Sequence, residues 1–335
     1  MLKNIAILVL IVNPLFSQTF FDYFFTSRFS RAIGLGSSYI GVAEGVETTF
    51  YNSAGLAFNP YYGIAYSYGN GLQMRGFDSN PFDVGVILPN HPKIGSFALS
   101  SHHLVLRNIN VTNSIYKFHY SRLLNSKISA GMSLNYYYQK IDYNLEELSE
   151  IKNSTQAFDV SLSALYIIPD LFFSNDKDRL KIGFQLNNLF SAEIEKLIQI
   201  VEGDQKDVLL QNMGSGISYY YDPQPNKVNG LDPITILIAF DFILDNKGQY
   251  HSYRFERFRL NFGFELTFLE VLALRYGREN QFNLTESEPS DPQYPISRFG
   301  IGLGLPLQKL FYSKKDIRFQ FDYSYSDWYG QCAVG

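Results

Sequence analysis

The residues of this 335-residue chain that could do chemistry are few, and their spacing matches no familiar catalytic or metal-binding set. His102, His103 and His119 are candidate general bases, but no serine nucleophile motif accompanies them. No carboxylate lies at ligand spacing from His91, His102 or His103. The single cysteine, Cys332, excludes a disulfide scaffold and a cysteine-based zinc site. We therefore predict no enzyme activity, no cofactor and no metal.

Phosphate and nucleic-acid binding are also disfavoured. Gly34-Leu35-Gly36 resembles the start of a phosphate-binding loop, but a third glycine is missing and no strand–turn–helix unit surrounds the motif. The formal net charge of −4 provides no basic field for nucleic acid. The acidic run that contains Glu146, Glu147 and Glu150 is expected to be a solvated face of a loop.

Several segments show a strict alternation of apolar and polar residues, and some of the charged residues lie in them. In the segment 127–140, Ile128, Ala130, Met132 and Leu134 alternate with small and polar residues, and the apolar set ends in tyrosines. The same alternation occurs in 158–166, 180–187, 258–266 and 317–325. A period of two that extends over roughly 8–12 residues and recurs this often predicts β-strands.

The length and the two faces of these strands favour a membrane barrel. A soluble β-sandwich also alternates, but its strands are usually about five or six residues long. Here the strands reach about ten residues, the apolar faces end in Tyr and Phe, and the opposite faces mix charges with Gly and Ser. We predict an all-β, transmembrane, antiparallel outer-membrane β-barrel. Its expected lumen-facing polar residues are Lys127, Asp159, Lys181, Asp241, Arg259, Glu265, Arg275, Arg318 and Asp322.

Thirteen strands are expected, and the lengths of their connections predict the topology. The connections 89–93, 123–126 and 268–270 are short, whereas 141–156, 189–211, 244–256 and 279–297 are long. Short periplasmic turns that alternate with long external loops place the N-terminus in the periplasm. Single-chain bacterial barrels usually have an even number of strands, so either a last strand is missing or residues before 60 supply one; we favour the missing strand. The predicted strands are 61–68, 81–88, 94–105, 114–122, 127–140, 157–168, 179–188, 212–221, 233–243, 257–267, 271–278, 298–305 and 316–326.

The N-terminal residues indicate export. Residues 1–17 read MLKNIAILVLIVNPLFS, with a basic start, an apolar run from Ile5 to Val12 and a small residue at the end. This is the pattern of a cleaved signal peptide. We expect a signal peptide at 1–17, a hatch segment at 18–60 inside the barrel mouth, and the barrel at 61–335. The expected location is the outer membrane of a Gram-negative bacterium.

The hatch segment carries a family resemblance. The residues that match are Arg31-Ala32, Gly34-Leu35-Gly36, Tyr39, Val42-Ala43, Tyr51-Asn52 and Ala54-Gly55-Leu56-Ala57. They are similar to the N-terminal motif of the PorV/PorQ outer-membrane proteins of type IX secretion, which belong with the FadL-like long-chain fatty-acid transporter barrels. Ser53 stands where the family has proline. The stretches 180–189, 262–277, 299–304 and 322–325 also resemble strands of that family. The motif residues expected to matter in the hatch are Arg31, Gly34, Gly36, Asn52, Ala54, Gly55 and Leu56.

The resemblance implies a 14-stranded barrel with a hatch, and it leaves two functions open. In the first, which we favour at this stage, the external loops engage secreted proteins or a translocon subunit, and the outer-membrane lipid surrounds the wall. In the second, the barrel is a passive transporter for fatty acids or other hydrophobic compounds. Transport of that kind requires an apolar patch on the inner face, whereas the predicted lumen set is charged. The family's closing strand has no match after Asp327, which supports the missing last strand.

Overall fold

The computed structural model describes most of the predicted barrel and the hatch. The residues described are 29–69, 79–106, 111–141, 154–173, 177–190, 193–195, 206–208, 211–223, 231–246, 255–283, 295–306 and 318–327. The predicted signal peptide, residues 18–28, the acidic run at 146–150 and the chain after residue 327 lie outside them. Among the described residues, no helix combines the length and apolar character needed to cross a bilayer.

Thirteen antiparallel strands form one continuous sheet, which confirms the predicted all-β fold class. Each strand pairs with its neighbours in the chain, except that a small hairpin of β8 (Glu193–Glu195) and β9 (Lys206–Val208) is inserted between β7 and β10. The sheet strands are β1 (Gly63–Tyr68), β2 (Ser79–Ile87), β3 (Ser96–Leu106), β4 (Val111–Leu123), β5 (Ile128–Ile141), β6 (Ser154–Pro169), β7 (Asp178–Asn187), β10 (Asn212–Tyr221), β11 (Ile234–Asn246), β12 (Phe255–Phe268), β13 (Leu272–Asn283), β14 (Ile296–Pro306) and β15 (Arg318–Asp327).

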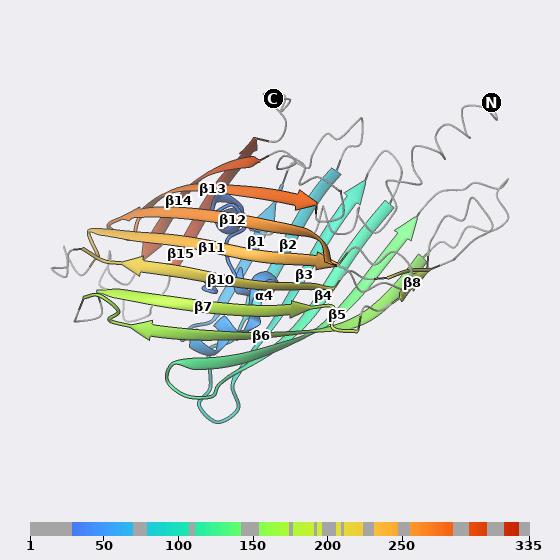
Figure 1. Cartoon of the computed structure of the whole chain (residues 1–335), viewed down its shortest axis with the longest axis horizontal. Coiled ribbons are helices and arrows are strands. Elements are labelled where there is room, and N and C mark those ends of the chain that lie inside the picture. The colour runs from blue at the N-terminus through green and yellow to red at the C-terminus, as the bar shows by residue number, and fades with distance from the viewer. Residues whose placement is uncertain are drawn as a thin grey trace.

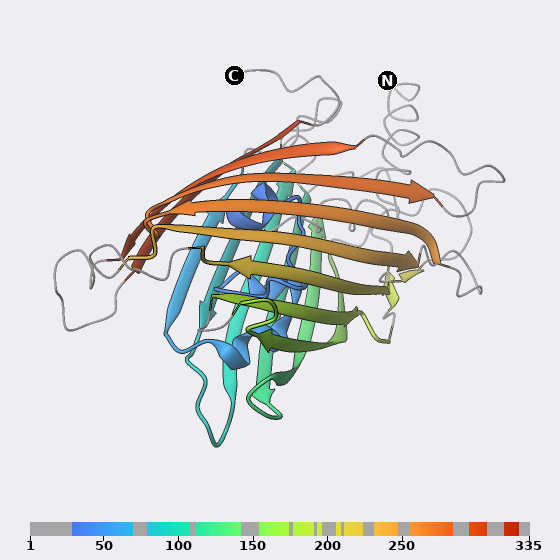
Figure 2. The ribbon, with the colours of Figure 1, turned by 60° about the vertical axis from the view of Figure 1, so that its left-hand side comes forward.

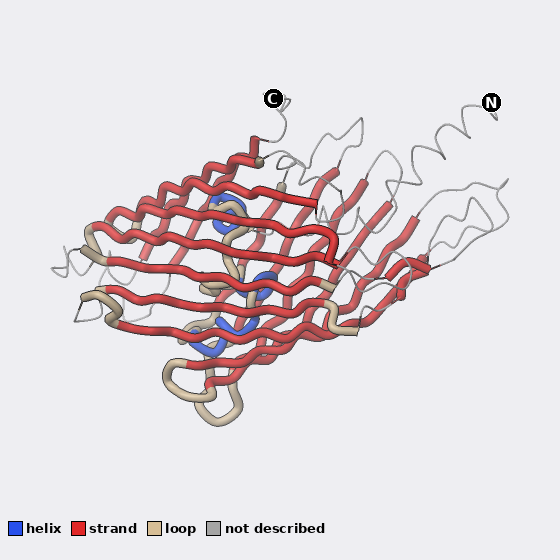
Figure 3. Tube along the Cα trace, viewed as in Figure 1, coloured by secondary structure: helices blue, strands red, loops and turns tan. Residues whose placement is uncertain are grey.

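The sheet curls around the N-terminal segment. Figures 1 and 2 show the half made of β11 to β15 facing the half made of β1 to β5, with the hatch in blue between them. The order of strands begins with β1 and ends with β15. Figure 3 shows that strands form nearly all of the wall and that the short helices lie inside it.

The outer face of the wall is apolar and aromatic. On β5 the outward residues run from Ile128 to Tyr138, which is about 33 Å at about 3.3 Å per residue. A strand tilt of about 40° reduces that length to a band about 25 Å tall, the height of the apolar band of outer-membrane barrels. Neighbouring rings also form a row across six strands, with centroid distances of 4.5 to 6.5 Å. The rings in that row are Tyr66, Phe82, His103, Tyr116, Tyr136 and Phe158.

The strands agree with the predicted alternation but differ at their ends. β11 and β13 continue to Asn246 and Asn283, past the predicted ends at 243 and 278. β5 begins at Ile128, so Lys127 lies in the exposed turn before it, where its backbone N–H donates to Asn125 Oδ1 at 2.8 Å. The Lys127 carbonyl still accepts from Ile167 N of β6 at 2.8 Å, but the side chain is exposed and is not among the buried inward residues.

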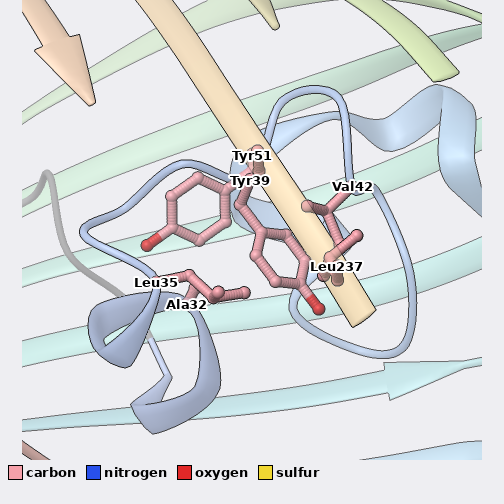
Figure 4. Close-up of a cluster of buried hydrophobic side chains, with 7 residues drawn as sticks. Ala32, Leu35, Tyr39, Val42, Tyr51 and Leu237 are labelled. Atoms are coloured by element: carbon pink, nitrogen blue, oxygen red, sulfur yellow. The ribbon is translucent and has the colours of Figure 1, made fainter. Parts of the chain in front are cut away.

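The hatch, which we define as residues 29–59, forms the core of the barrel. It contains the helices α3 (Ser30–Gly34), α4 (Thr48–Tyr51) and the 3-10 helix η1 (Ser53–Phe58). Phe29, Val46 and Leu56 pack against Ile87 and Ala98 of β2 and β3. On the opposite side, Figure 4 shows hatch side chains gathered against β11. That cluster consists of Ala32, Leu35, Tyr39, Val42, Tyr51, Leu237 and Ala239.

We predict that an arginine on the outward face destabilises the barrel much more than one at the lumen mouth. Leu260→Arg places a charge on the exposed apolar face of β12 and should cost about 2–4 kcal/mol if this face meets the middle of the bilayer. Thr267→Arg, on the opposite face of the same strand, is the matched control. Unfolding titrations in lipid vesicles would measure both free energies, and equal costs would contradict the membrane position of this face.

Candidate functional site: the hatch and its seat in the wall

Glycines bring the hatch backbone against the wall backbone. A Cβ on Gly34 would lie 3.1 Å from Gly300 Cα, and a Cβ on Gly277 would collide with the backbone of Leu35 and Gly36. Gly36 also has φ +64°, a conformation that other residues rarely adopt. The close pairs are Gly34 with Gly300, Gly36 with Gly277, and Gly41 with Gly216. The glycines of the N-terminal motif therefore serve close approach and a turn, not phosphate binding.

Arg31 of α3 anchors the hatch to β12 through a bidentate ion pair with Glu265. Its Nε and Nη2 donate to the two oxygens of Glu265 at 3.1 and 2.8 Å. Glu265 also accepts from Arg275 of β13 at 2.5 Å, and Arg275 donates to Asp322 of β15 at 2.6 Å. Glu265 and Arg275 are buried. The alternating charges form a chain of ion pairs from the hatch through three wall strands.

A second ionic cluster surrounds Glu44. Its carboxylate lies 2.6 Å from Lys181 Nζ and 2.9 Å from Arg179 Nη2, both on β7, and 3.6 Å from Arg31 Nη2. Burial alone would raise the pKa of Glu44, but Lys181, Arg179 and Arg31 outweigh it and hold that pKa well below its usual range. The charged form of Glu44 is thus the stable one, and Arg31 connects the two clusters.

Wall side chains also satisfy the backbone of the hatch. The Asp241 carboxylate of β11 accepts from the backbone N–H groups of Tyr39 and Ile40 at 2.7 and 2.8 Å. Ser218 Oγ donates to the Gly41 carbonyl at 3.0 Å, and Lys181 Nζ donates to the Val42 carbonyl at 3.0 Å. Buried backbone groups are costly without partners, so this bend of the hatch depends on the wall for its hydrogen bonds.

Asn52 and Ala54 fix the other end of the hatch. Asn52 Nδ2 donates to the carbonyls of Ile40 and Ala164 at 2.8 and 3.1 Å, and its Oδ1 accepts from Ala54 N at 3.1 Å. The Ala54 carbonyl accepts from Ser129 Oγ at 2.8 Å and from Ser121 Oγ at 3.2 Å. Both serines lie near the β4–β5 turn, so η1 lies at the end of the barrel with the short connections.

The three candidate bases have structural contacts. His119 is fully buried between Ser53 Oγ at 3.2 Å and Ser100 Oγ at 2.9 Å, which connects η1 to β3. His102 is buried against Asp83 at 2.6 Å. His103 lies in the outer row of rings, stacked on Phe82, and its Nδ1 lies 2.9 Å from Ser114 Oγ. The described contacts of these histidines thus connect parts of the barrel to one another.

A small crevice lies between the hatch and the wall of β4 to β7. Residues 49–53 and the wall there enclose a crevice of about 10 Å³, enough for one water. Lys117, Ser133 and Gln185 contribute to its wall side.

Most of the predicted site residues lie where the hatch contacts the inner face of the wall, a region that we call the seat. Arg31, Gly34, Gly36, Asn52 and Ala54 make the contacts given above, Gly55 leaves no room for a Cβ beside the Ala43 carbonyl, and Leu56 is buried in the hatch core. Of the predicted lumen set, Lys181, Asp241, Glu265, Arg275 and Asp322 belong to the seat or its ion-pair chain.

The other predicted lumen residues lie elsewhere. Asp159 is buried and accepts from Phe190 N at 3.1 Å, and Arg259 pairs with Asp245 at 2.9 Å. Arg318 begins β15, but its side chain lies outside the described residues.

Several inward residues, some of which contact the hatch, were not among those predicted from the sequence. Arg298 donates to Ser37 Oγ at 2.5 Å and to Glu279 at 2.7 Å, and Asp83 accepts from Phe29 N at 3.4 Å. Asp245 and Glu279 lie in stretches predicted as loops, because β11 and β13 are longer than expected. Their inward positions follow from extending the alternation, which is the signal that would have identified them.

The fold and this seat define a class: a membrane-type β-barrel whose own N-terminal segment packs inside the lumen. No protein-family model and no curated protein matches the chain. Among solved structures, the CymD monoaromatic hydrocarbon channel resembles it with a TM-score of 0.44 and 10% sequence identity, over 88% of this chain and 94% of that chain. A likeness at this level carries no argument about what the chain binds.

We predict that Glu265→Gln releases the hatch. The substitution leaves Arg31 and Arg275 without their shared carboxylate, and breaking a buried ion pair costs about 3–5 kcal/mol. Limited proteolysis of the folded barrel in micelles should then cleave within residues 29–59. Asp245→Asn, which disrupts an ion pair between two wall strands, is the matched control and should keep the hatch protected. Equal protection of the hatch in both variants would contradict the anchoring role of Glu265.

Gly277→Ala tests the backbone contact independently of charge. The added Cβ has no space against Gly36, and overpacking of this kind costs about 1–3 kcal/mol. The temperature at which the folded band disappears on a gel should fall. In Gly69→Ala, the Cβ would lie 3.2 Å from Pro81 Cγ, outside the hatch, and the temperature should stay near that of the unaltered protein. A fall of the same size in both variants would exclude a specific effect of the hatch contact.

Proposed function

We propose that the chain is a gated outer-membrane channel for small hydrophobic molecules, with the hatch as its gate. The observation that carries the proposal is an apolar patch on the inner face of β3 to β6. It consists of Leu104, Ile115, Tyr137 and Ala157, all of which are buried. This is the inward patch that hydrophobic transport requires and that the predicted, charged lumen set did not include.

Strand register makes three of these residues direct neighbours, and Leu104 lies diagonal to Ile115. Ile115 lies directly opposite Tyr137, and Tyr137 lies directly opposite Ala157. The Tyr137 hydroxyl donates to Asn188 Oδ1 at 2.6 Å, so the polar tip of this ring is satisfied within the protein. Ile115 is four residues beyond His119 on β4, about 13 Å farther from the short-connection end. The patch therefore lies farther than η1 from the short-connection end, toward the long connections.

Other inward side chains toward the long connections are ionic. Asp245 pairs with Arg259, and Glu279 pairs with Arg298, which also donates to Ser37 of the hatch. In the proposed route a hydrophobic molecule enters from the long-connection end, passes along the patch and then meets the hatch. Movement of the hatch away from its seat opens the route to the short-connection end, which we assign to the periplasm.

Asn113 indicates which kind of ligand suits the apolar patch. It is fully buried between Leu104 and Gln139 in the strand register, and neither its Oδ1 nor its Nδ2 has a hydrogen-bond partner among the described residues. An amide at the edge of an apolar patch suits a ligand with one polar group, as a fatty acid has, better than a pure hydrocarbon.

The secretion hypothesis depends on the N-terminal resemblance and on the long connections. The motif residues make contacts that any hatch of this shape needs, so they favour neither function over the other. Most residues of the long connections lie outside the described residues. The apolar patch is a specific observation for transport, and for that reason we place transport first.

Uptake of a fluorescent fatty acid tests the channel. Cells that carry the full chain in their outer membrane should take it up faster than cells without it. Ile115→Asn, which places an amide in the patch, should reduce uptake about fivefold or more, whereas the conservative Ile115→Val should not. A difference in gel mobility between heated and unheated samples would verify that each variant is folded. Uptake equal to that of cells without the chain, or unchanged in Ile115→Asn, would exclude this function.

A further inference from the structure

The connection between β6 and β7 presents three consecutive apolar side chains outside the lumen. Leu171, Phe172 and Phe173 follow Pro169 and Asp170 directly, and their exposed fractions are 37, 72 and 45%. Figure 3 shows this connection as a loop at the left-hand end of the two strands. We call these three residues the aromatic turn. Neither the hatch nor the proposed transport function uses them.

The aromatic turn packs on the outer face of the barrel. The Phe172 ring meets the Tyr219 ring edge-on, with centroids 5.8 Å apart, and the Phe173 ring lies 5.0 Å from that of Tyr221. Both tyrosines lie on β10. Ser218, the residue before Tyr219, points inward, because its Oγ donates to the Gly41 carbonyl. By alternation, Tyr219 and Tyr221 point outward. The turn is therefore attached to the lipid side of the wall.

Asp178, the first residue of β7, accepts hydrogen bonds from polar groups of the aromatic turn. Its carboxylate accepts from Phe172 N at 2.8 Å, from Phe173 N at 3.1 Å and from the Tyr219 hydroxyl at 3.0 Å. Asp178 itself is buried. With these backbone donors already bonded, the turn does not need water at the positions where it presents its rings.

We propose that the aromatic turn inserts into the bilayer at the boundary between headgroups and acyl chains, at the short-connection end of the barrel. The aromatic turn is continuous with the apolar face that the wall presents to lipid, through Phe184 on β7 and Ile217 on β10. Three large exposed apolar side chains in water would be unfavourable, whereas aromatic residues are favoured at this boundary. The turn thus anchors one end of the barrel at a fixed depth. The proposal depends on the membrane-spanning fold and is independent of what the channel carries.

A single tryptophan in the turn would report its surroundings. The chain has one tryptophan, Trp328, so Trp328→Phe provides a background without tryptophan. Phe172→Trp in this background would be refolded into phosphatidylcholine vesicles whose acyl chains carry bromine near the headgroup end. Bromine quenches tryptophan only at close range, so the emission should fall about twofold or more relative to vesicles without bromine. Lys127→Trp, in the exposed β4–β5 turn at the same end, is the control and should be quenched much less.

Two further variants keep the proposal falsifiable. If Phe172→Trp does not fold, Phe173→Trp carries the same prediction. Asp178→Asn together with Phe172→Trp removes the carboxylate that shapes the turn, and the quenching should then decrease while the gel shift of the folded barrel remains. Emission from Phe172→Trp that resembles the Lys127→Trp control would overturn the proposal and leave a protein partner in the aqueous space as the occupant of this patch.

Discussion

The structure depends on satisfying an irregular stretch of backbone inside a barrel. The hatch has only short helices, so much of its backbone lacks hydrogen bonds within the segment, and burial makes each missing bond costly. The wall supplies them: Asp241 accepts from the bend at Tyr39 and Ile40, and serines of β4 and β5 donate to the Ala54 carbonyl. These polar residues of the inner face are therefore parts of the seat.

The close contact between the hatch backbone and the wall also explains which inward positions of the wall are glycines. Inward positions that meet the hatch backbone are glycines, because a Cβ at Gly216 or Gly277 would collide with it. An inner face with small residues at some positions and charges at others produces the mixture of Gly, Ser and charges that alternates with the apolar outer face. One sequence pattern thus records two environments: lipid on one side of each strand, and a folded segment on the other.

How far the sequence predicts this arrangement is clear from particular residues. Alternation places Glu265 and Asp241 on the inner face correctly, since the side-chain period of a strand is two. It does not place strand ends, so Asp245 is predicted in a loop although it lies in β11, and Lys127 is predicted to face the lumen although its side chain is exposed in the turn before β5. Nor does it identify partners: Arg31 and Glu265 are 234 positions apart, and no local pattern relates them. The apolar patch at Ile115 was missed because it arises from register across four strands, not from any one of them.

The ionic character of the seat bears on whether the hatch is a permanent core or a gate. Well-packed apolar residues could hold the hatch as firmly, because buried ion pairs bring little net stability over hydrophobic substitutes. The two kinds of seat differ once the hatch has left. An apolar seat would then expose its surface to water, whereas Asp241, Lys181 and Glu265 would regain hydration in a wet lumen. Because Arg31 belongs to both ionic clusters, displacing this one hatch residue loosens the hold of β7 and β12 together. A polar seat therefore lowers the free energy of the undocked state relative to an apolar one, as a gate requires and a permanent core does not.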